Sequence, residues 1–82
     1  MAMSEIEWMD TFGDNLRDLM KDARISQREL AEESGLSEAT ISRYINKRRM
    51  PSAAALASLA HALPCADLSD LVYFGDRVET RI

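Results

Sequence analysis

The stretch SQRELAEESGLSEATISRYINKRRMPS, residues 26–52, decides the fold of this 82-residue sequence. Ser26 followed by Glu29 has the spacing of a capping box, in which the two side chains satisfy free N–H groups at the start of a helix. Gly35 ends that helix, because glycine adopts the left-handed conformation common at helix ends without strain. The pattern therefore predicts a short helix over residues 27–34.

A second helix follows almost at once. Ser37 is the N-cap that begins it, and Pro51 prevents it from continuing. We expect this helix over about residues 38–46, joined to the first only by residues 35–37. A connection this short forces a sharp angle between the two helices.

The two helices have distinct inner and outer faces. Leu30, Ile41 and Tyr44 are predicted to be buried, whereas the outward face of the second helix is polar and becomes basic at its end. That composition is expected of a helix lying in the major groove of DNA, although an ordinary helical hairpin remains an alternative at this point. The outward residues are Glu38, Ala39, Thr40, Ser42, Arg43 and Lys47.

The residues before the stretch predict a longer helix, because apolar side chains recur at three- and four-residue steps. Ser4 followed by Glu7 is a further capping box and predicts a start there. Gly13 weakens the early turns, so a later start at Asp10 or Thr11 remains open. The stripe expected to face the core consists of Ile6, Met9, Phe12, Leu16, Leu19, Met20 and Ala23.

Two helices are predicted after the stretch. Ser52 caps the first, which Pro64 ends, and Asp67 caps a short last helix that continues to Gly75. The fold class that follows is all-α, with five helices in a compact arrangement. The apolar residues of these two helices are Leu56, Leu59, Ala60 and Leu63, then Leu68, Leu71 and Val72.

Charge is unevenly distributed along the chain. The formal net charge is −4, which on its own argues against a nucleic-acid partner. Residues 1–22, however, hold six acids against two bases, whereas residues 39–66 hold no acid and four bases. The basic segment is either a solvated loop or a contact for phosphates. Its cations are Arg43, Lys47, Arg48 and Arg49.

Several classes of protein are excluded by composition. A chain of 82 residues forms one domain, and its one cysteine, Cys65, and one histidine, His61, cannot build a disulfide or a structural zinc site. No catalytic motif appears, no apolar run is long enough to span a bilayer, and the acidic N-terminus does not resemble a signal peptide. We therefore expect a cytoplasmic protein that is not an enzyme and needs no cofactor or metal.

The segment SQRELAEESGLSEATISRYINKRRMPSAAALASLAHAL (residues 26–63) and its flanking helices resemble the lambda-repressor-like helix-turn-helix proteins, also called the Cro/repressor or Xre family. The resemblance covers about residues 12–74 and places the motif itself at about 27–46. It implies the five-helix fold of such DNA-binding domains, binding of double-stranded DNA as a homodimer, and control of transcription from an operator.

The same resemblance assigns two sets of site residues. It implies that bases are read by Ser37, Glu38, Ala39, Thr40, Ser42 and Arg43. It implies that phosphates are bound by residues at the start of the first motif helix and in the loop after the second, here Gln27, Arg28, Asn46, Lys47, Arg48 and Arg49. The N–H groups at a helix N-terminus are themselves suited to an anion.

Individual positions refine this picture. Arg43 is the strongest candidate for a bidentate contact to guanine, whereas Glu38 either accepts from a cytosine amino group or only favours the helix dipole. Some family members pair an arginine with a glutamate at the positions where this chain has Met20 and Ile45. An apolar pair there is compatible with the fold, but this chain then lacks that arginine as a phosphate contact. Pro64 also stands where glycine is common, which affects the path into the last helix.

Two features concern assembly. We expect Leu71, Val72 and Phe74 of the last helix to form a two-fold contact between subunits. The tail at about residues 76–82 alternates apolar and charged residues, and it is either a frayed terminus or an arm that adds a strand to the partner subunit.

Two functions remain open from the sequence. The first is a sequence-specific transcriptional regulator of the phage repressor or restriction-modification controller type, binding a palindromic operator as a homodimer. The alternative is the antitoxin of a toxin-antitoxin pair, which binds a toxin protein through acidic faces and represses its own operon. The length of the chain favours the first.

Overall fold

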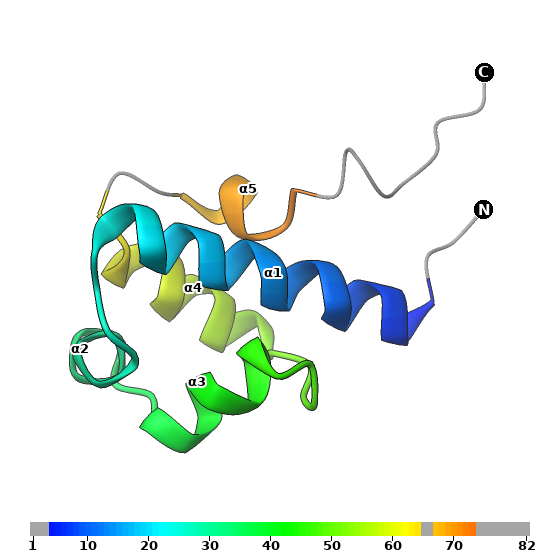
Figure 1. The fold of residues 1–82 in the computed structure, drawn as a ribbon, viewed down its shortest axis with the longest axis horizontal. Helices are drawn as coiled ribbons and strands as arrows, with labels where there is room; N and C mark the ends of the chain where they lie inside the picture. Colours follow the sequence, from blue (N-terminus) through cyan, green and yellow to red (C-terminus); the bar gives the residue numbers. More distant parts are fainter. Residues whose placement is uncertain (1–3, 65–66, 74–82) are drawn as a thin grey trace.

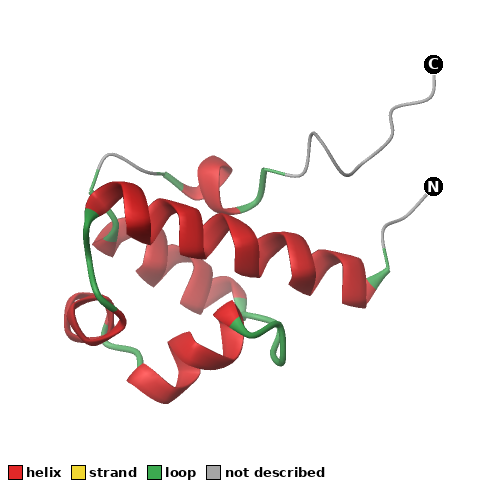
Figure 2. Cartoon of the chain, in the orientation of Figure 1, coloured by secondary structure: helices red, strands yellow, loops and turns green. Residues whose placement is uncertain are grey.

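Five helices form the part of the chain that the computed structural model describes, residues 4–64 and 67–73 (Figures 1 and 2). No strand occurs within these residues, so the predicted all-α fold class is confirmed. The helices are α1 (Glu5–Ala23), α2 (Gln27–Ser34), α3 (Glu38–Ile45), α4 (Ala53–Ala62) and α5 (Leu68–Leu71).

Capping residues fix where each helix begins. In every case the side-chain oxygen of the cap accepts a hydrogen bond from the backbone N–H three residues later, which satisfies one of the free donors of the first turn. At the start of α1 the Glu7 carboxylate also accepts from the backbone N–H of Ser4, at 2.9 Å. The longer version of this helix is therefore the one that forms. The caps are Ser4, Ser26, Ser37, Ser52 and Asp67, as predicted.

The core lies between the helices, where α1 packs against α3 and α5, and α4 packs against α2 and α5. In Figure 1, α5 lies along one side of α1 while α3 lies on the other, and α4 crosses behind it. Phe12 links α1 to α3, because its ring meets that of Tyr44 edge-on with centroids 5.6 Å apart. Trp8 stacks on the same Phe12 ring at 5.4 Å. The largest fully buried side chains are Phe12, Leu16, Leu30, Ile41, Leu59, Leu63 and Leu71.

The sequence was wrong about Ile6 and about the length of α5. Ile6 is 76% exposed, because the first turn of α1 extends beyond the helices that pack against the rest of it (Figure 1). Helix α5 ends at Leu71 rather than at Gly75, because the Asn15 side chain on α1 binds the carbonyls of Leu71 and Tyr73. Gly75 itself, like Cys65 and the predicted tail, lies outside the described residues.

Candidate nucleic-acid interface

The turn between α2 and α3 has the conformation that the sequence predicts. Gly35 has a φ of +78°, and its N–H donates to the carbonyl oxygen of Ala31 at 3.0 Å. A Cβ on Gly35 would meet no atom within 4 Å, so glycine is needed here for its backbone conformation and not for space. Figure 1 shows α2 nearly end-on while α3 lies nearly in the plane, so the two helices cross steeply.

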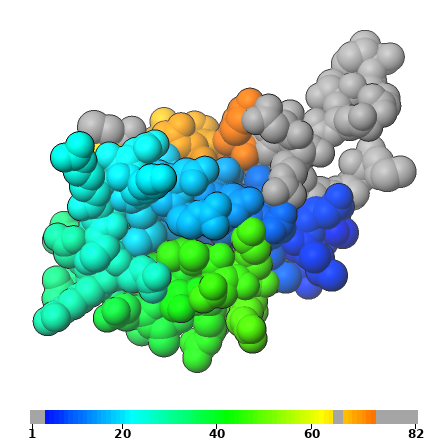
Figure 3. Space-filling model, in the orientation of Figure 1, coloured from blue at the N-terminus to red at the C-terminus, as the bar shows by residue number. Residues whose placement is uncertain are grey.

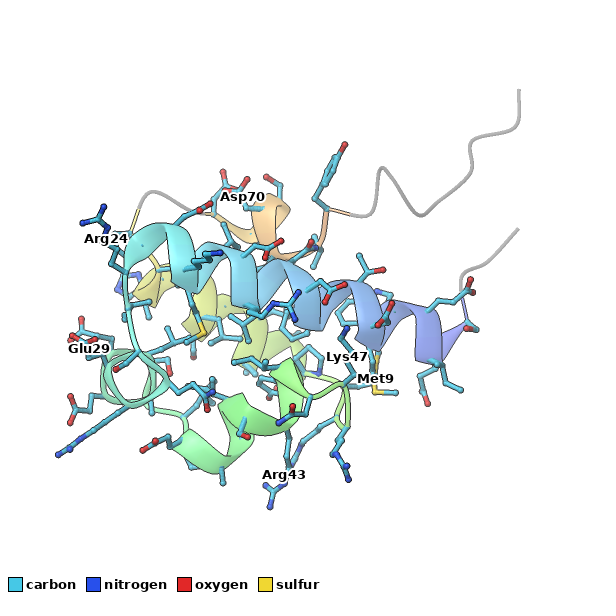
Figure 4. All side chains as sticks on the ribbon, in the orientation of Figure 1. Met9, Arg24, Glu29, Arg43, Lys47 and Asp70 are labelled. Atoms are coloured by element: carbon cyan, nitrogen blue, oxygen red, sulfur yellow. The ribbon has the colours of Figure 1, made fainter. Side chains whose placement is uncertain are left out.

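Helix α3 is anchored by its inner face and open on its outer face. Ile41 is completely buried and Tyr44 is nearly so. On the opposite side Glu38, Ala39 and Arg43 are exposed, and the Arg43 side chain points away from the body of the protein (Figure 4). Figure 3 shows α3 and the following loop together at one edge of the molecule.

The smaller predicted base-reading residues are partly occupied by local hydrogen bonds. The Ser37 hydroxyl accepts from the Thr40 N–H at 3.0 Å and donates to the Thr40 hydroxyl at 2.8 Å. The Ser42 hydroxyl accepts from the Asn46 side-chain amide at 3.2 Å, and both Thr40 and Ser42 are half-buried. Ser37, Glu38, Ala39 and Arg43 are the exposed residues of the six, and the Ser37 hydroxyl among them is engaged in the helix cap.

The loop after α3 is held against the end of that helix by its own backbone. The Arg48 N–H donates to the carbonyl of Arg43 at 2.8 Å, and the Lys47 N–H donates to the carbonyl of Tyr44 at 3.1 Å. Asn46, Arg48 and Arg49 are exposed. The structure thus brings Arg43 of α3 and these loop residues into one contiguous region.

Lys47 differs from the other basic residues of the loop. Its ammonium nitrogen lies 2.8 Å from carboxylate oxygens of both Asp10 and Asp14 on α1. Hydrogen bonds to Asp10 and then to Asp14 raise the pKa of Lys47 above its usual range. Sequence reasoning missed these partners, because nothing in the local pattern relates Lys47 to acids more than thirty residues earlier.

The remaining predicted phosphate contacts lie at the start of α2. Gln27 is the first residue of the helix and is half-buried, whereas Arg28 is exposed and lies 3.7 Å from the Glu32 carboxylate one turn later. Hydrogen bonds from the backbone N–H and then the side chain of Ser26 lower the pKa of Glu29. The N-terminal end of α2 therefore carries positively and negatively charged side chains close together.

The predicted subunit contact needs one correction. Leu71 is completely buried inside the domain, where α5 packs against α1 and α4, so its side chain does not reach a second subunit. Val72 is half-buried, and Phe74 lies outside the described residues. The exposed apolar side chains next to Val72 are instead Leu68 and Tyr73, at 48% and 59% exposure.

Other chemistry was not expected of this chain, and His61 is exposed, as predicted. Within residues 4–64 and 67–73, no group of three or more histidine, cysteine, aspartate or glutamate side chains is placed to hold a metal ion. No helix in the same part of the chain is both long and apolar enough to cross a bilayer.

Comparisons with known proteins agree with this geometry. A family model described as Helix-turn-helix (HTH_3) matches residues 16–70. The HTH-type transcriptional repressor RghR of Bacillus subtilis is 43% identical over 56 residues, which are 67% of this chain but 42% of the repressor. The chain thus spans about two fifths of the length of that curated relative.

Two solved structures are similar across most of their own length. The restriction-modification controller protein C.AhdI from Aeromonas hydrophila is 30% identical, with 77% of this chain and 94% of that one covered at a TM-score of 0.73. The clp gene regulator ClgR from Corynebacterium glutamicum is 34% identical, with 79% and 82% covered at a TM-score of 0.74. The family is helix-turn-helix, and these relatives are named as a transcriptional repressor, a restriction-modification controller protein and a gene regulator, which agrees with the predicted class of DNA-binding regulators.

Proposed function

The chain belongs to the helix-turn-helix family, and on that premise we propose that it is a transcriptional repressor that binds a palindromic operator as a homodimer. The observation that carries the proposal is the outer face of α3, where Arg43 points into solvent beside Glu38 and Ala39 (Figure 4). We expect a DNA-binding regulator of this kind in the cytoplasm.

Base readout is proposed for the accessible residues of α3. Arg43 presents a planar guanidinium suited to the O6 and N7 acceptors of guanine in the major groove. Glu38 would accept from a cytosine amino group, and Ala39 would contact a thymine methyl group. Ser37, Thr40 and Ser42 would contribute through hydroxyl groups that already take part in local hydrogen bonds.

Phosphate contacts are proposed for both sides of the motif. Arg48 and Arg49 are exposed immediately after α3, together with Asn46. Gln27 and Arg28 lie at the N-terminus of α2, where backbone N–H groups favour an anion. These contacts would fix the register of α3 on the duplex without specifying sequence.

Dimerisation is proposed through the surface next to α5, namely Leu68, Val72 and Tyr73, with Phe74 as a further candidate. A two-fold dimer would place its recognition helices about 34–36 Å apart, so that half-sites are about 10 base pairs apart centre to centre. Sedimentation of the protein with a selected duplex tests this. One protomer bound to a single non-palindromic site would contradict it.

The test of readout compares two arginines. Arg43→Ala is expected to cost about 1–3 kcal/mol per half-site and to relax preference at one base pair. Arg48→Ala is expected to weaken binding to all sequences alike. Arg24→Ala is the control, because Arg24 lies at the end of α1 and not on the face of α3 that carries Arg43 (Figure 4). An unchanged ranking of operator variants with Arg43→Ala would show that Arg43 does not read the bases.

A second candidate is supported by the exposed acids of α2, Glu29, Glu32 and Glu33. These side chains could hold a basic protein, as an antitoxin holds a toxin, while the same domain represses its operon. Co-purification with the product of the neighbouring gene tests this candidate. Glu32→Lys together with Glu33→Lys should then abolish the complex and leave operator binding intact.

A further inference from the structure

The side chain of Lys47 runs from the loop after α3 back to α1, in the direction opposite to Arg43 (Figure 4). Its ammonium group lies 2.8 Å from both Asp10 and Asp14, which are one helical turn apart on the same face of α1. Only a third of the Lys47 side chain is exposed, and the two carboxyl side chains are similarly sheltered. Arg48 and Arg49, the next residues of the loop, are exposed.

The charges within this cluster favour the arrangement. Two carboxylates one turn apart repel each other, and an ammonium group between them relieves that repulsion. If Lys47 turned to a DNA phosphate, it would give up its hydrogen bonds to both carboxylates, although Asp14 would keep Arg17, which lies 3.1 Å away. A move of Lys47 to the phosphates therefore carries a cost that a move of Arg48 or Arg49 does not.

The backbone at Lys47 gives a second, independent observation. Its φ is 63°, a left-handed conformation that glycine adopts without strain and that side chains with a Cβ adopt only at a cost. A lysine is nevertheless present, and its two ion pairs offset that cost. The side chain thus has a role at this position that glycine could not fill.

We propose that Asp10 and Asp14 are positioning residues that hold the Lys47 ammonium group against α1. Lys47 is thereby kept from binding a phosphate beside the other loop cations, which lowers the affinity for DNA of any sequence. The proposal rests on the proposed function and refines it, because Lys47 was one of the phosphate contacts expected from the sequence. Phosphate binding after α3 then falls to Asn46, Arg48 and Arg49.

The experiment measures how the dissociation constant for a random-sequence duplex depends on salt. Each phosphate contact adds about 0.9 to the slope of log Kd against log salt concentration. Lys47→Gly should change this slope by less than half of that amount, since glycine suits the backbone and the lysine makes no phosphate contact. Arg48→Gln, the matched control, should lower the slope by about 0.9.

The aspartates provide the decisive comparison. Asp10→Asn with Asp14→Asn should release Lys47, raise the slope by about 0.9 and tighten non-specific binding several-fold. Adding Lys47→Gly to that pair should return the slope to that of the unaltered protein. If the double asparagine variant fails to fold, Asp14→Asn alone tests the same effect at smaller amplitude.

Each result has a definite meaning. A slope lowered by about 0.9 in Lys47→Gly alone, or no rise in the double asparagine variant, overturns the role given to Asp10 and Asp14. Failure of the unaltered protein to bind duplex DNA in a salt-dependent way would instead contradict the proposed function itself. The two failures are therefore distinguished within one set of titrations.

Discussion

Gly13 of α1 lies directly beneath the backbone carbonyl of Tyr44 at the end of α3. A Cβ on residue 13 would be 2.7 Å from that oxygen and 3.2 Å from the carbonyl oxygen of Ile45. Both atoms belong to the backbone and cannot rotate away. Glycine is therefore required for the close crossing of α1 and α3, which places α3 relative to the rest of the domain.

Gly13→Ala should destabilise the protein. Alanine is favoured over glycine within a helix by about 1 kcal/mol, but here its Cβ would force the end of α3 outward, and overpacking of this kind costs about 1–3 kcal/mol. We expect a net loss in the free energy of unfolding measured with urea. Asp18→Ala, on the exposed side of α1, is the control for helix propensity. A Gly13→Ala variant more stable than the unaltered protein would show that the close crossing of α1 and α3 does not require glycine at this position.

Arg24→Gly should stabilise the protein. Arg24 caps the end of α1 with a φ of 56°, and its N–H donates to the carbonyls of Lys21 and Met20. A residue with a Cβ is destabilised by about 1–2 kcal/mol in this conformation. Glycine avoids that strain but loses more conformational freedom on folding, which offsets part of the gain. We expect a gain of about 0.5–1 kcal/mol, measured by thermal unfolding. Arg24→Ala keeps the strain, and an equal gain in that variant would show that charge and not conformation is responsible.

The starts of the helices followed from the sequence because N-capping is local. Ser26, Ser37 and Ser52 each bond to an N–H three residues away, and no distant residue enters into that choice. The same holds for Gly35, whose positive φ depends only on the turn that it forms. These features were sufficient to predict the motif and the exposed position of Arg43.

What the sequence missed depends on contacts between helices. Lys47 was expected from the sequence to have the same role as its neighbours Arg48 and Arg49, namely phosphate binding. Only the crossing of α3 over α1 brings its ammonium group to Asp14. Leu71 was predicted to contact a second subunit, but α5 turns it into the core of its own domain. Neither outcome can be obtained from periodicity, because an apolar stripe does not indicate which surface covers it.

Glu29→Gln should reduce the loss of stability in acid. The hydrogen bonds from Ser26 lower the pKa of Glu29 in the folded protein, so its carboxylate stabilises the fold above its usual pKa. That contribution disappears as the pH falls through the lowered pKa. The free energy of unfolding should therefore fall less between pH 6 and pH 2 in Glu29→Gln, as followed by circular dichroism; these bounds are about two units to either side of a carboxyl pKa. Glu33→Gln, at the other end of α2, is the control, and identical pH profiles for all three proteins would exclude this role.

Asn15→Ala should release α5 from α1. The Asn15 side-chain amide donates to the carbonyl oxygens of Leu71 and Tyr73, at 2.9 Å each, and α5 itself has only four residues. Since a hydrogen bond contributes about 0.5–1.5 kcal/mol, we expect a loss of about 1–2 kcal/mol and faster amide exchange at Leu71 and Val72.

The matched control for dimerisation is Asn46→Ala, because the Asn46 side-chain amide donates to the neighbouring Ser42 hydroxyl on an exposed surface. If the surface next to α5 forms the subunit contact, Asn15→Ala should also raise the dimer dissociation constant in sedimentation, whereas Asn46→Ala should leave it unchanged. Operator affinity would then fall with dimerisation by mass action. Faster exchange at Val72 without any change in dimerisation would show that α5 is only a part of the domain core and that the subunits meet elsewhere.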